Sequence, residues 1–238
     1  MVGIGPGNRL DRTRRAEQVI ADSQVVAGYH LYLEHIADLT AGKELIASGM
    51  MQETERCRAA LQRATRGAVV ALVSSGDPGV YGMAGLALEM AAAEGFDVPI
   101  EIVPGISAAN SAAARLGAPL MLDYACISLS DLLVPWESIR TRLVALAGAD
   151  LVVALYNPRS KKRVRQLEEA VAIMLTHRNE STPVGIVTAI GEADERIELT
   201  TLGNLLTAEV GMRSTVIIGN STSLHLGERM ITPRGYQL

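Results

Sequence analysis

VVALVSSGDPGVYG, residues 69–82, joins an apolar run to a turn that contains three glycines and one proline. The run is short and rich in valine, which favours a strand buried on both faces of a parallel sheet. Glycines let the backbone turn sharply and approach a ligand closely. Ligands of open α/β sheets bind beyond the carboxyl ends of the strands, which is where this turn lies. The stretch therefore predicts an α/β sheet with a ligand site at one edge.

Two similar turns flank it in the sequence, MVGIGPGN at residues 1–8 and VPGISAA at residues 103–109. Each joins an apolar run to a helical pattern, so the three turns together predict one shared crevice. GIGPG is not a Walker A loop, because no Gly-Lys-Ser/Thr follows, and it lacks the third glycine of a dinucleotide fingerprint, where Asn8 stands. Tight strand-to-helix turns that bind nothing are the alternative interpretation.

Apolar runs and helical periodicity alternate along the first half, as in a mainly parallel sheet covered by helices on both faces. The predicted strands are Val2–Ile4, Val25–Gly28, Val69–Ser74 and Ile100–Val103. The predicted helices are Arg14–Ala21, Thr54–Ala64, Met83–Ala93 and one from Ser107 to about Ala118.

The second half indicates a more mixed sheet, with an antiparallel pair flanking the loop Gly191–Glu195. We expect two α/β domains, residues 1–118 and 119–238. The predicted strands of the second domain are Tyr124–Ser130, Leu151–Tyr156, Val184–Ala189, Arg196–Thr200 and Thr215–Gly219. Its predicted helices are Ile139–Ala147 and Arg163–Leu175.

Composition excludes several classes of protein. The 238 residues include one Trp and one Phe, so the cores must be aliphatic, and the net charge of −4 argues against general nucleic-acid binding. Cys57, Cys126 and the four histidines show no metal-ligand spacing, so no metal site is predicted. Two distant thiols are typical of a reducing, cytoplasmic setting. No run is long and apolar enough to span a membrane, and no signal peptide is expected.

The order and spacing of the motifs resemble the tetrapyrrole methylase family along nearly the whole chain. The branch that is most similar comprises the C-17-methyltransferases that act on precorrin-3 compounds in cobalamin biosynthesis. The stretches that carry the resemblance are GIGPG, SSGDPGVYGMA (74–84), VPGISAANSAAARLGAPL (103–120), ISLSDLLVPWESI (127–139), ALYNPRSKKR (154–163), PVGIVTAIG (183–191), STVIIGNS (214–221) and TPRGY (232–236).

The resemblance implies a cytoplasmic homodimer that binds S-adenosylmethionine in a cleft between two α/β domains and methylates a tetrapyrrole. Asn8 departs from the acidic residue that often follows GPG, and the first strand is short at its amino end, which is consistent with a few further residues before Met1. The cofactor contacts of the family fall on Pro6, Ser75, Gly76, Asp77, Val80, Ser107, Ala108, Tyr156 and Ala189.

Methyl transfer from a sulfonium is a displacement with an already activated donor, so the protein mainly has to position the reactants. The ring contraction that the resemblance implies also moves a proton, for which Asp131 is the first candidate acid or base and Asp123 the second. For Asp131, capping of a local turn is the alternative. Asp77 has two interpretations, a carboxylate that accepts hydrogen bonds from the ligand or an Asx turn or helix cap.

Basic residues follow two of the turns in this acidic chain. Tetrapyrrole precursors carry many carboxylates, which a protein of net negative charge repels unless it has local positive patches. We therefore expect substrate carboxylates to be bound by some of Arg12, Arg15, Arg159 and Lys162. A solvated basic surface is the alternative interpretation.

Three other functions stay open at this point. Another precorrin methylase, acting at C-11 or C-20, would share the same motifs. A nicotinamide-dependent oxidoreductase or a non-catalytic nucleotide-binding module would share only the first turn, and neither accounts for the GDP and PGISA turns. These motifs do not distinguish a cobalt-carrying substrate from a metal-free one.

Overall fold

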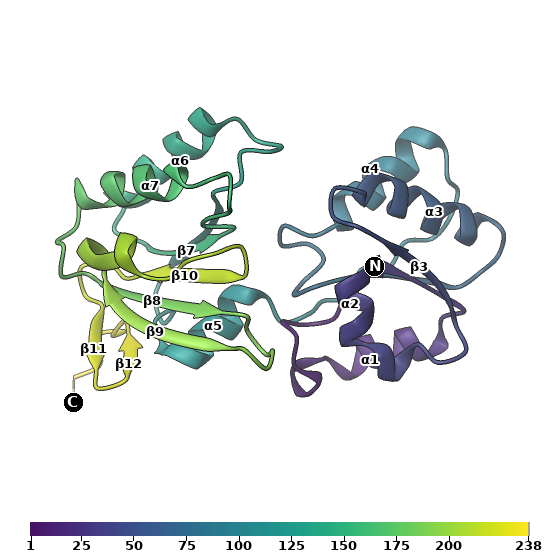
Figure 1. The fold of residues 1–238 in the computed structure, drawn as a ribbon, viewed down its shortest axis with the longest axis horizontal. Coiled ribbons are helices and arrows are strands. Elements are labelled where there is room, and N and C mark those ends of the chain that lie inside the picture. Colours follow the sequence, from purple (N-terminus) through teal and green to yellow (C-terminus); the bar gives the residue numbers. More distant parts are fainter. Residues whose placement is uncertain (238) are drawn as a thin grey trace. The chain divides into compact units, whose positions relative to one another are not determined.

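The computed structural model describes residues 1–237 and divides into two units, Met1–Ala108 and Ala109–Leu238 (Figure 1). Both are α/β, the first with a parallel sheet and the second with mixed sheets, which confirms the predicted fold class. The expected division at residue 118 places the alanine-rich helix with the first unit, whereas the structure groups it with the second. The helix packs there because the Leu116 side chain covers Gly185 of the second sheet.

The first unit contains a four-stranded sheet of strand order β1-β4-β2-β3, in which every pairing is parallel. Its elements, in chain order, are β1 (Val2–Gly3), η1 (Arg9–Asp11), α1 (Arg14–Asp22), β2 (Val25–Tyr29), α2 (His30–His35), η2 (Ala37–Leu39), β3 (Glu44–Ser48), α3 (Glu53–Thr65), β4 (Val70–Ser74) and α4 (Ala84–Glu94).

Helices cover both faces of this sheet, as the alternation in the sequence predicts. Ala16 and Ile20 of α1 and Leu33 of α2 form one core with the sheet, and α3 and α4 form another on the opposite face (Figure 1). α1 begins at Arg14 because the Thr13 side chain accepts the Ala16 amide, and α4 ends where Gly95 takes a left-handed conformation.

One local expectation for the first unit differs from the structure, and two short elements were not predicted. The predicted strand Ile100–Val103 is extended chain rather than a ladder, and only Val103 forms a bridge, to Val2. Pro99 and Pro104 flank it and lack the amide hydrogens that a longer ladder needs. The edge strand β3 and the six-residue helix α2 were not predicted, because short elements carry little periodicity.

The second unit is built on a five-stranded sheet of order β6-β7-β10-β8-β9, with a separate small sheet β11-β12-β5. Its elements are α5 (Ala108–Leu116, whose first residue belongs to the first unit), β5 (Gly117–Ala118), β6 (Tyr124–Ser128), α6 (Trp136–Gly148), β7 (Val152–Tyr156), α7 (Arg165–Leu175), β8 (Pro183–Thr188), β9 (Arg196–Thr201), η3 (Leu202–Thr207), β10 (Ser214–Ile218), β11 (Leu224–Leu226) and β12 (Arg229–Ile231).

The strand directions of the five-stranded sheet decide which loops meet. β6 and β7 are parallel, and β7 and β8 both run antiparallel to β10, so β6, β7 and β8 point the same way. β8 and β9 form the antiparallel pair that the sequence predicts around the loop 191–195. α6, α7 and η3 pack on one face around Leu143, Leu167 and Leu205. Among the described residues, no helix has the length and apolar character needed to cross a membrane.

Candidate ligand-binding site

The three glycine turns of the first unit converge at one edge of its sheet. A Cβ atom at Gly105 would lie 2.1 Å from the Gly76 carbonyl oxygen, and one at Gly3 would lie 2.6 Å from the same oxygen. Real Cβ atoms do not approach a backbone that closely, so only glycine allows these three segments to pack together. The sequence motifs GIGPG, SSGDPG and VPGIS therefore form one continuous structure at the carboxyl ends of β1 and β4.

Backbone hydrogen bonds hold the turns in register. The Gly76 amide donates to the Gly5 carbonyl at 2.7 Å, and the Gly5 amide donates back to the Gly76 carbonyl at 3.2 Å. The Gly3 amide donates to the Val103 carbonyl at 3.0 Å. Gly5 and Gly76 both have positive φ angles, +76° and +63°, which glycine adopts without strain.

Asp77 ties two of the turns together. One carboxylate oxygen accepts the Gly79 amide at 2.8 Å, which is the Asx turn that the sequence allowed as an alternative. The other accepts the Gly105 amide at 3.0 Å and so links the GDP turn to the PGIS turn. Ligand binding by this carboxylate stays a prediction, but a structural function is now evident, because both oxygens hold backbone amides.

The remaining first-unit candidates surround this junction. Pro6, Ser75, Ser107 and Ala108 are half-buried, and the Val80 side chain is exposed. Within residues 1–237 the Ser75 hydroxyl has no hydrogen-bond partner, so it is available to a ligand. Small side chains and one available hydroxyl beside closely packed backbone fit a ligand recognised through shape and a few polar contacts.

Tyr156 is the last residue of β7, and Ala189 directly follows β8. These two strands run in the same direction, so both residues lie at the carboxyl edge of the second sheet. The Tyr156 hydroxyl accepts the Ala109 amide at 2.9 Å, in the first turn of α5. Ala189 is buried and has a φ of +55°, an unfavourable angle for alanine that indicates a closely defined turn.

Sequence reasoning missed two polar residues at the same edge. Asn157, with a φ of +49°, donates through its side chain to the Ser128 hydroxyl at 3.0 Å, and Ser128 also accepts the Ser130 amide. Asn157 follows Tyr156 in the YNPRS stretch, and asparagine tolerates the left-handed conformation better than most residues. The position of Asn between a strand and a proline was the signal that could have identified it.

The two carboxylates proposed as acid or base lie at opposite edges of the second sheet. Asp131 follows the carboxyl end of β6, is exposed, and accepts a hydrogen bond from the Gln166 side chain at 2.7 Å. It is not the residue that caps α6, whose N-cap is Pro135. Asp123 precedes β6 and is therefore at the amino edge, away from Tyr156 along the strands. This placement disfavours Asp123.

Arg12 and Arg15 have partners within the first unit. The buried Arg12 guanidinium forms a bidentate ion pair with Asp38, with distances of 3.0 and 2.8 Å. This interaction holds the pKa of Asp38 below its ordinary value, chiefly through the hydrogen bonds from Arg12. Arg15 is exposed and pairs with Glu101. Arg12 therefore stabilises the fold after the first turn, because its donors are directed to Asp38 rather than to solvent.

Arg159 and Lys162 differ from these two arginines. Arg159 is half-buried and Lys162 is exposed, and within the part of the chain that the structure describes neither side chain makes a hydrogen bond or an ion pair. Both lie in the segment between β7 and α7, beyond the carboxyl edge of the second sheet. Their charges are available to an anionic ligand.

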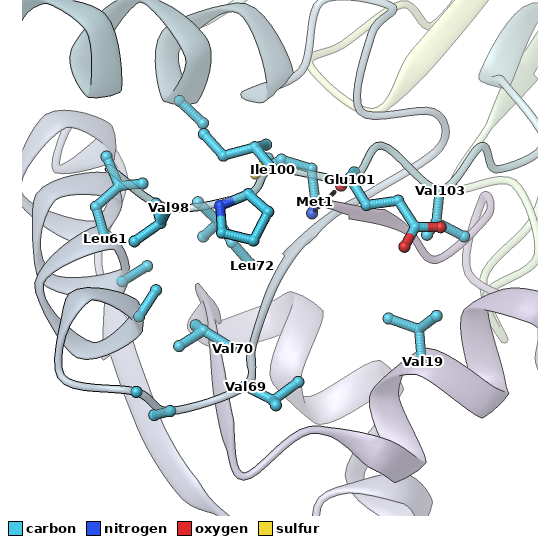
Figure 2. A pocket seen from close by; sticks show the side chains of 16 residues that line it. Met1, Val19, Leu61, Val69, Val70, Leu72, Val98, Ile100, Glu101 and Val103 are labelled. Carbon is cyan, nitrogen blue, oxygen red and sulfur yellow. Dashed lines mark hydrogen bonds between the residues drawn. The ribbon is translucent and has the colours of Figure 1, made fainter. Parts of the chain in front are cut away.

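A groove in the first unit lies at the other end of the sheet. This groove, of about 410 Å³, is bordered by Met1 before β1, by Val69 and Val70 at the amino end of β4, and by Leu61 and Ile100 (Figure 2). Its lining is almost entirely aliphatic. Ligands of parallel α/β sheets bind at the carboxyl edge, so we do not assign the ligand site to this groove despite its size.

The chemistry that these residues can perform is limited. Burial raises the pKa of the Cys57 and Cys126 thiols, so neither is a thiolate nucleophile at neutral pH. Among the described residues no group of three or more His, Cys, Asp or Glu side chains is arranged to hold a metal ion.

Comparison with known proteins gives one family match and several relatives. Residues 1–206 match the sequence profile of the family described as Tetrapyrrole (Corrin/Porphyrin) Methylases. The chain is 44% identical over 238 residues to the probable cobalt-factor III C(17)-methyltransferase of Salmonella typhimurium, covering 100% of this chain and 99% of that protein. It is 46% identical to the cobalt-factor III methyltransferase of Priestia megaterium, of which it spans only 45%.

Two solved structures share the fold. The crystal structure of the methyltransferase CobJ superposes with a TM-score of 0.91 and 33% identity, covering 98% of both chains. The uroporphyrin-III C-methyltransferase of Thermus thermophilus, complexed with S-adenosylhomocysteine, has a TM-score of 0.71 and 25% identity over 92% of this chain and 95% of that one.

Proposed function

Because the chain belongs to the tetrapyrrole methylase family, we propose that it transfers a methyl group from S-adenosylmethionine to C-17 of a precorrin-3 type tetrapyrrole, with ring contraction, in cobalamin biosynthesis. The observation that carries the proposal is the full-length similarity to a C(17)-methyltransferase at 44% identity. Both relatives named above are described as acting on cobalt-factor III, so we propose the cobalt-carrying form as the substrate.

The cofactor would be held by the junction of the three glycine turns. S-adenosylmethionine supplies an activated methyl group, and the protein has to hold it against the acceptor carbon and exclude water. The Ser75 hydroxyl and the exposed Gly79–Gly82 segment offer polar and backbone contacts. Asp77, between them, accepts hydrogen bonds from the Gly79 and Gly105 amides and so fixes the start of this segment against the PGIS turn. Positioning of this kind contributes about 7–11 kcal/mol to the lowering of a reaction barrier.

Two residues of the second unit complete the proposed cofactor contacts, Tyr156 and Ala189. Both lie at the carboxyl edge of the second sheet. The Tyr156 hydroxyl already fixes the start of α5 through the Ala109 amide. A Tyr156→Phe variant removes that acceptor and keeps the ring, so we expect weaker S-adenosylhomocysteine binding with a small loss of stability, as measured by calorimetry and thermal unfolding.

Proton handling in the ring contraction would involve Asp131 rather than Asp123. Asp131 lies beyond the carboxyl end of β6 and is exposed, so it can reach a ligand at that edge, and Gln166 orients it. Asp131→Asn should lower kcat without weakening cofactor binding, whereas Asp123→Asn should change neither. Equal kcat values for the two variants would remove Asp131 from the mechanism.

Substrate carboxylates would be bound by Arg159 and Lys162, whose charges have no partner in residues 1–237. Arg15 is a weaker candidate because it already pairs with Glu101. Arg159→Gln should raise the apparent KM for the tetrapyrrole and flatten its dependence on salt, because an exposed charge is screened by ions. Cofactor affinity should not change. Indifference of the KM to salt and to this substitution would mean that the segment is a solvated surface.

The decisive experiment incubates the purified protein with S-adenosylmethionine and, separately, with cobalt-factor III and metal-free precorrin-3B. We expect a product that is heavier by one methyl group from the cobalt compound, with the spectral change of a contracted ring. Methylation of a precorrin-4 type substrate instead would support the C-11 alternative, and binding of NADH without S-adenosylhomocysteine would support an oxidoreductase. We further propose a cytoplasmic homodimer, which light scattering of the purified protein would test.

A further inference from the structure

Arg56, on α3, is a buried cation that none of the functions above uses. Its side chain is 3% exposed. One terminal nitrogen donates to the Ser48 hydroxyl and to the Gly49 carbonyl, the latter at 3.3 Å, and the other lies 3.3 Å from the Met83 sulfur. The guanidinium thus joins the end of β3 to the residue that precedes α4.

The positive charge of Arg56 is only weakly compensated. The carboxylate that lies near it belongs to Glu53, at 3.9 Å, and that side chain is 45% exposed. The Nε atom of Arg56 is buried and has no hydrogen-bond partner among the described residues. A buried charge with an unpaired donor destabilises a fold unless the contacts that it makes are needed elsewhere.

The two segments joined by Arg56 are both closely defined loops at the carboxyl edge of the first sheet. In the loop after β3, the Gly49 amide donates to the Gln52 side chain at 2.7 Å and Met51 has a φ of +65°. In the turn after β4, the Ala84 amide donates to the Pro78 carbonyl at 2.9 Å and Tyr81 has a φ of +55°. Left-handed conformations of such residues are strained and persist only where the surroundings enforce them.

The turn after β4 is the one that contains Ser75, Gly76, Asp77 and Val80. Asp77 fixes its first half to Gly105, and the Ala84 amide closes its second half onto the Pro78 carbonyl. Met83 ends the turn, and its sulfur is in contact with Arg56. Arg56 therefore contacts this end of the turn from the buried side.

We propose that Arg56 is a positioning residue for methyl transfer: by joining Ser48 and Gly49 to Met83, it fixes the second half of the GDPGVYG turn in the conformation that binds the cofactor. This inference rests on the proposed function. Arg56 does not touch the ligand, because its side chain is buried beneath the two loops. It acts through the backbone of residues 78–83.

Calorimetry with S-adenosylhomocysteine tests the proposal on the full chain. Arg56→Met keeps the volume of the side chain but removes the donors, and we expect the Kd to rise about tenfold, which corresponds to about 1.4 kcal/mol. Arg56→Lys, which can still donate to Ser48 and Gly49, should recover most of the affinity. Met83→Leu, which removes only the sulfur contact, should raise the Kd by a smaller factor. In the methylation assay, Arg56→Met should raise the KM for S-adenosylmethionine by a similar factor and change kcat little.

Two arginines serve as matched controls. Arg58, on the same helix, is more exposed and pairs with Glu94, so Arg58→Met should leave the Kd unchanged. Arg178 is buried in the second unit, donates to the Gly219 and Leu151 carbonyls, and also has an unpaired Nε. Arg178→Met should lower the melting temperature as Arg56→Met does, without changing the Kd.

A Kd for Arg56→Met within twofold of the wild-type value, at a temperature where the variant is folded, would overturn the proposal. So would an equal loss of affinity in Arg178→Met, which would make the effect one of general stability. If Arg56→Met does not fold, the Arg56→Lys and Met83→Leu variants decide, and wild-type affinity in both would also overturn it. A wild-type protein that binds no S-adenosylhomocysteine would instead contradict the proposed function itself.

Discussion

The two edges of the parallel sheet in the first unit differ in almost every property except the strands that they share. At the carboxyl edge, three glycine turns pack so closely that a single added carbon at Gly105 would lie 2.1 Å from the Gly76 oxygen. At the amino edge, an aliphatic groove of about 410 Å³ is open beside Val69 and Ile100 (Figure 2). The edge with this groove is the one with fewer groups that could recognise a polar ligand.

The difference has a physical origin in the direction of the strands. Parallel strands followed by helices place the amino ends of those helices, with their unpaired backbone amides, at the carboxyl edge. The amino edge receives the carboxyl ends of the helices and the apolar starts of the strands. The carboxyl edge therefore offers more backbone donors to a polar ligand than the amino edge does.

The largest effect is expected from adding one methyl group at the carboxyl edge, which tests whether the turns have to pack this closely. Gly105→Ala forces the new Cβ into the Gly76 carbonyl and the Gly3 backbone, neither of which can move without separating the turns. We expect a loss of at least about 4 kcal/mol in the free energy of unfolding, or no folding at all, measured by denaturant titration. Any protein that folds should not bind S-adenosylhomocysteine.

Gly85→Ala is the matched control for that substitution. A Cβ at Gly85 meets no atom within 4 Å, and the residue lies within α4. Alanine is favoured over glycine in a helix by about 0.5–1 kcal/mol, so this variant should be slightly more stable than wild type and bind the cofactor normally. Similar behaviour of the two variants would show that the close approach of the turns is unimportant.

Asp77 stabilises the carboxyl edge by accepting hydrogen bonds from two backbone amides. Asp77→Ala removes both hydrogen bonds and should lower the free energy of unfolding by about 2–3 kcal/mol, with a rise in the S-adenosylhomocysteine Kd. Asp77→Asn can accept one amide but not both, so it should lose about half as much. Thermal unfolding and calorimetry measure the two effects, and a lower stability with unchanged affinity would restrict Asp77 to a structural function.

The ion pair behind the first turn predicts a dependence on pH. Arg12 lowers the pKa of Asp38 in the folded state, so the pair stabilises the fold above the ordinary Asp pKa of about 3.9, and this stability is lost as the pH falls through the lowered value. Asp38→Asn should cost about 1–2 kcal/mol at neutral pH, a modest value because Asp38 is 34% exposed. In melting curves the gap between variant and wild type should narrow below about pH 4. A gap independent of pH would exclude the ion pair as its cause.

The smallest effect is expected at the amino edge. Ala64→Leu places three more carbons in the aliphatic groove, and we expect a change of less than about 1 kcal/mol in the free energy of unfolding, in either direction. The S-adenosylhomocysteine Kd should stay at its wild-type value. A clear loss of cofactor affinity in this variant would move the ligand site to the groove and overturn the assignment of the carboxyl edge.

The sequence identified most of the strands and the turns between them, because apolar periodicity and glycine positions act locally. It predicted a strand at Ile100–Val103, where the structure has extended chain because two prolines interrupt the ladder. It did not predict the short elements α2 and β3. It also grouped Arg12 with Arg159. Arg12 pairs with Asp38, 26 residues farther along the chain, whereas the Arg159 side chain has no partner among the residues that the structure describes. Ion pairs between distant residues leave no trace in local composition.

The amino-acid sequence by itself determined the α/β class, the parallel first sheet and the family, because these depend on short-range patterns and on motifs such as GIGPG and SSGDPG. The contacts among Gly3, Gly76 and Gly105, the hydrogen bond from Gly105 to Asp77, and the contact of Arg56 with Met83 became apparent only from the tertiary structure. Each of these contacts joins residues that are far apart in the chain. Their distances depend on how whole strands and helices pack, and the local pattern of residues does not contain that information.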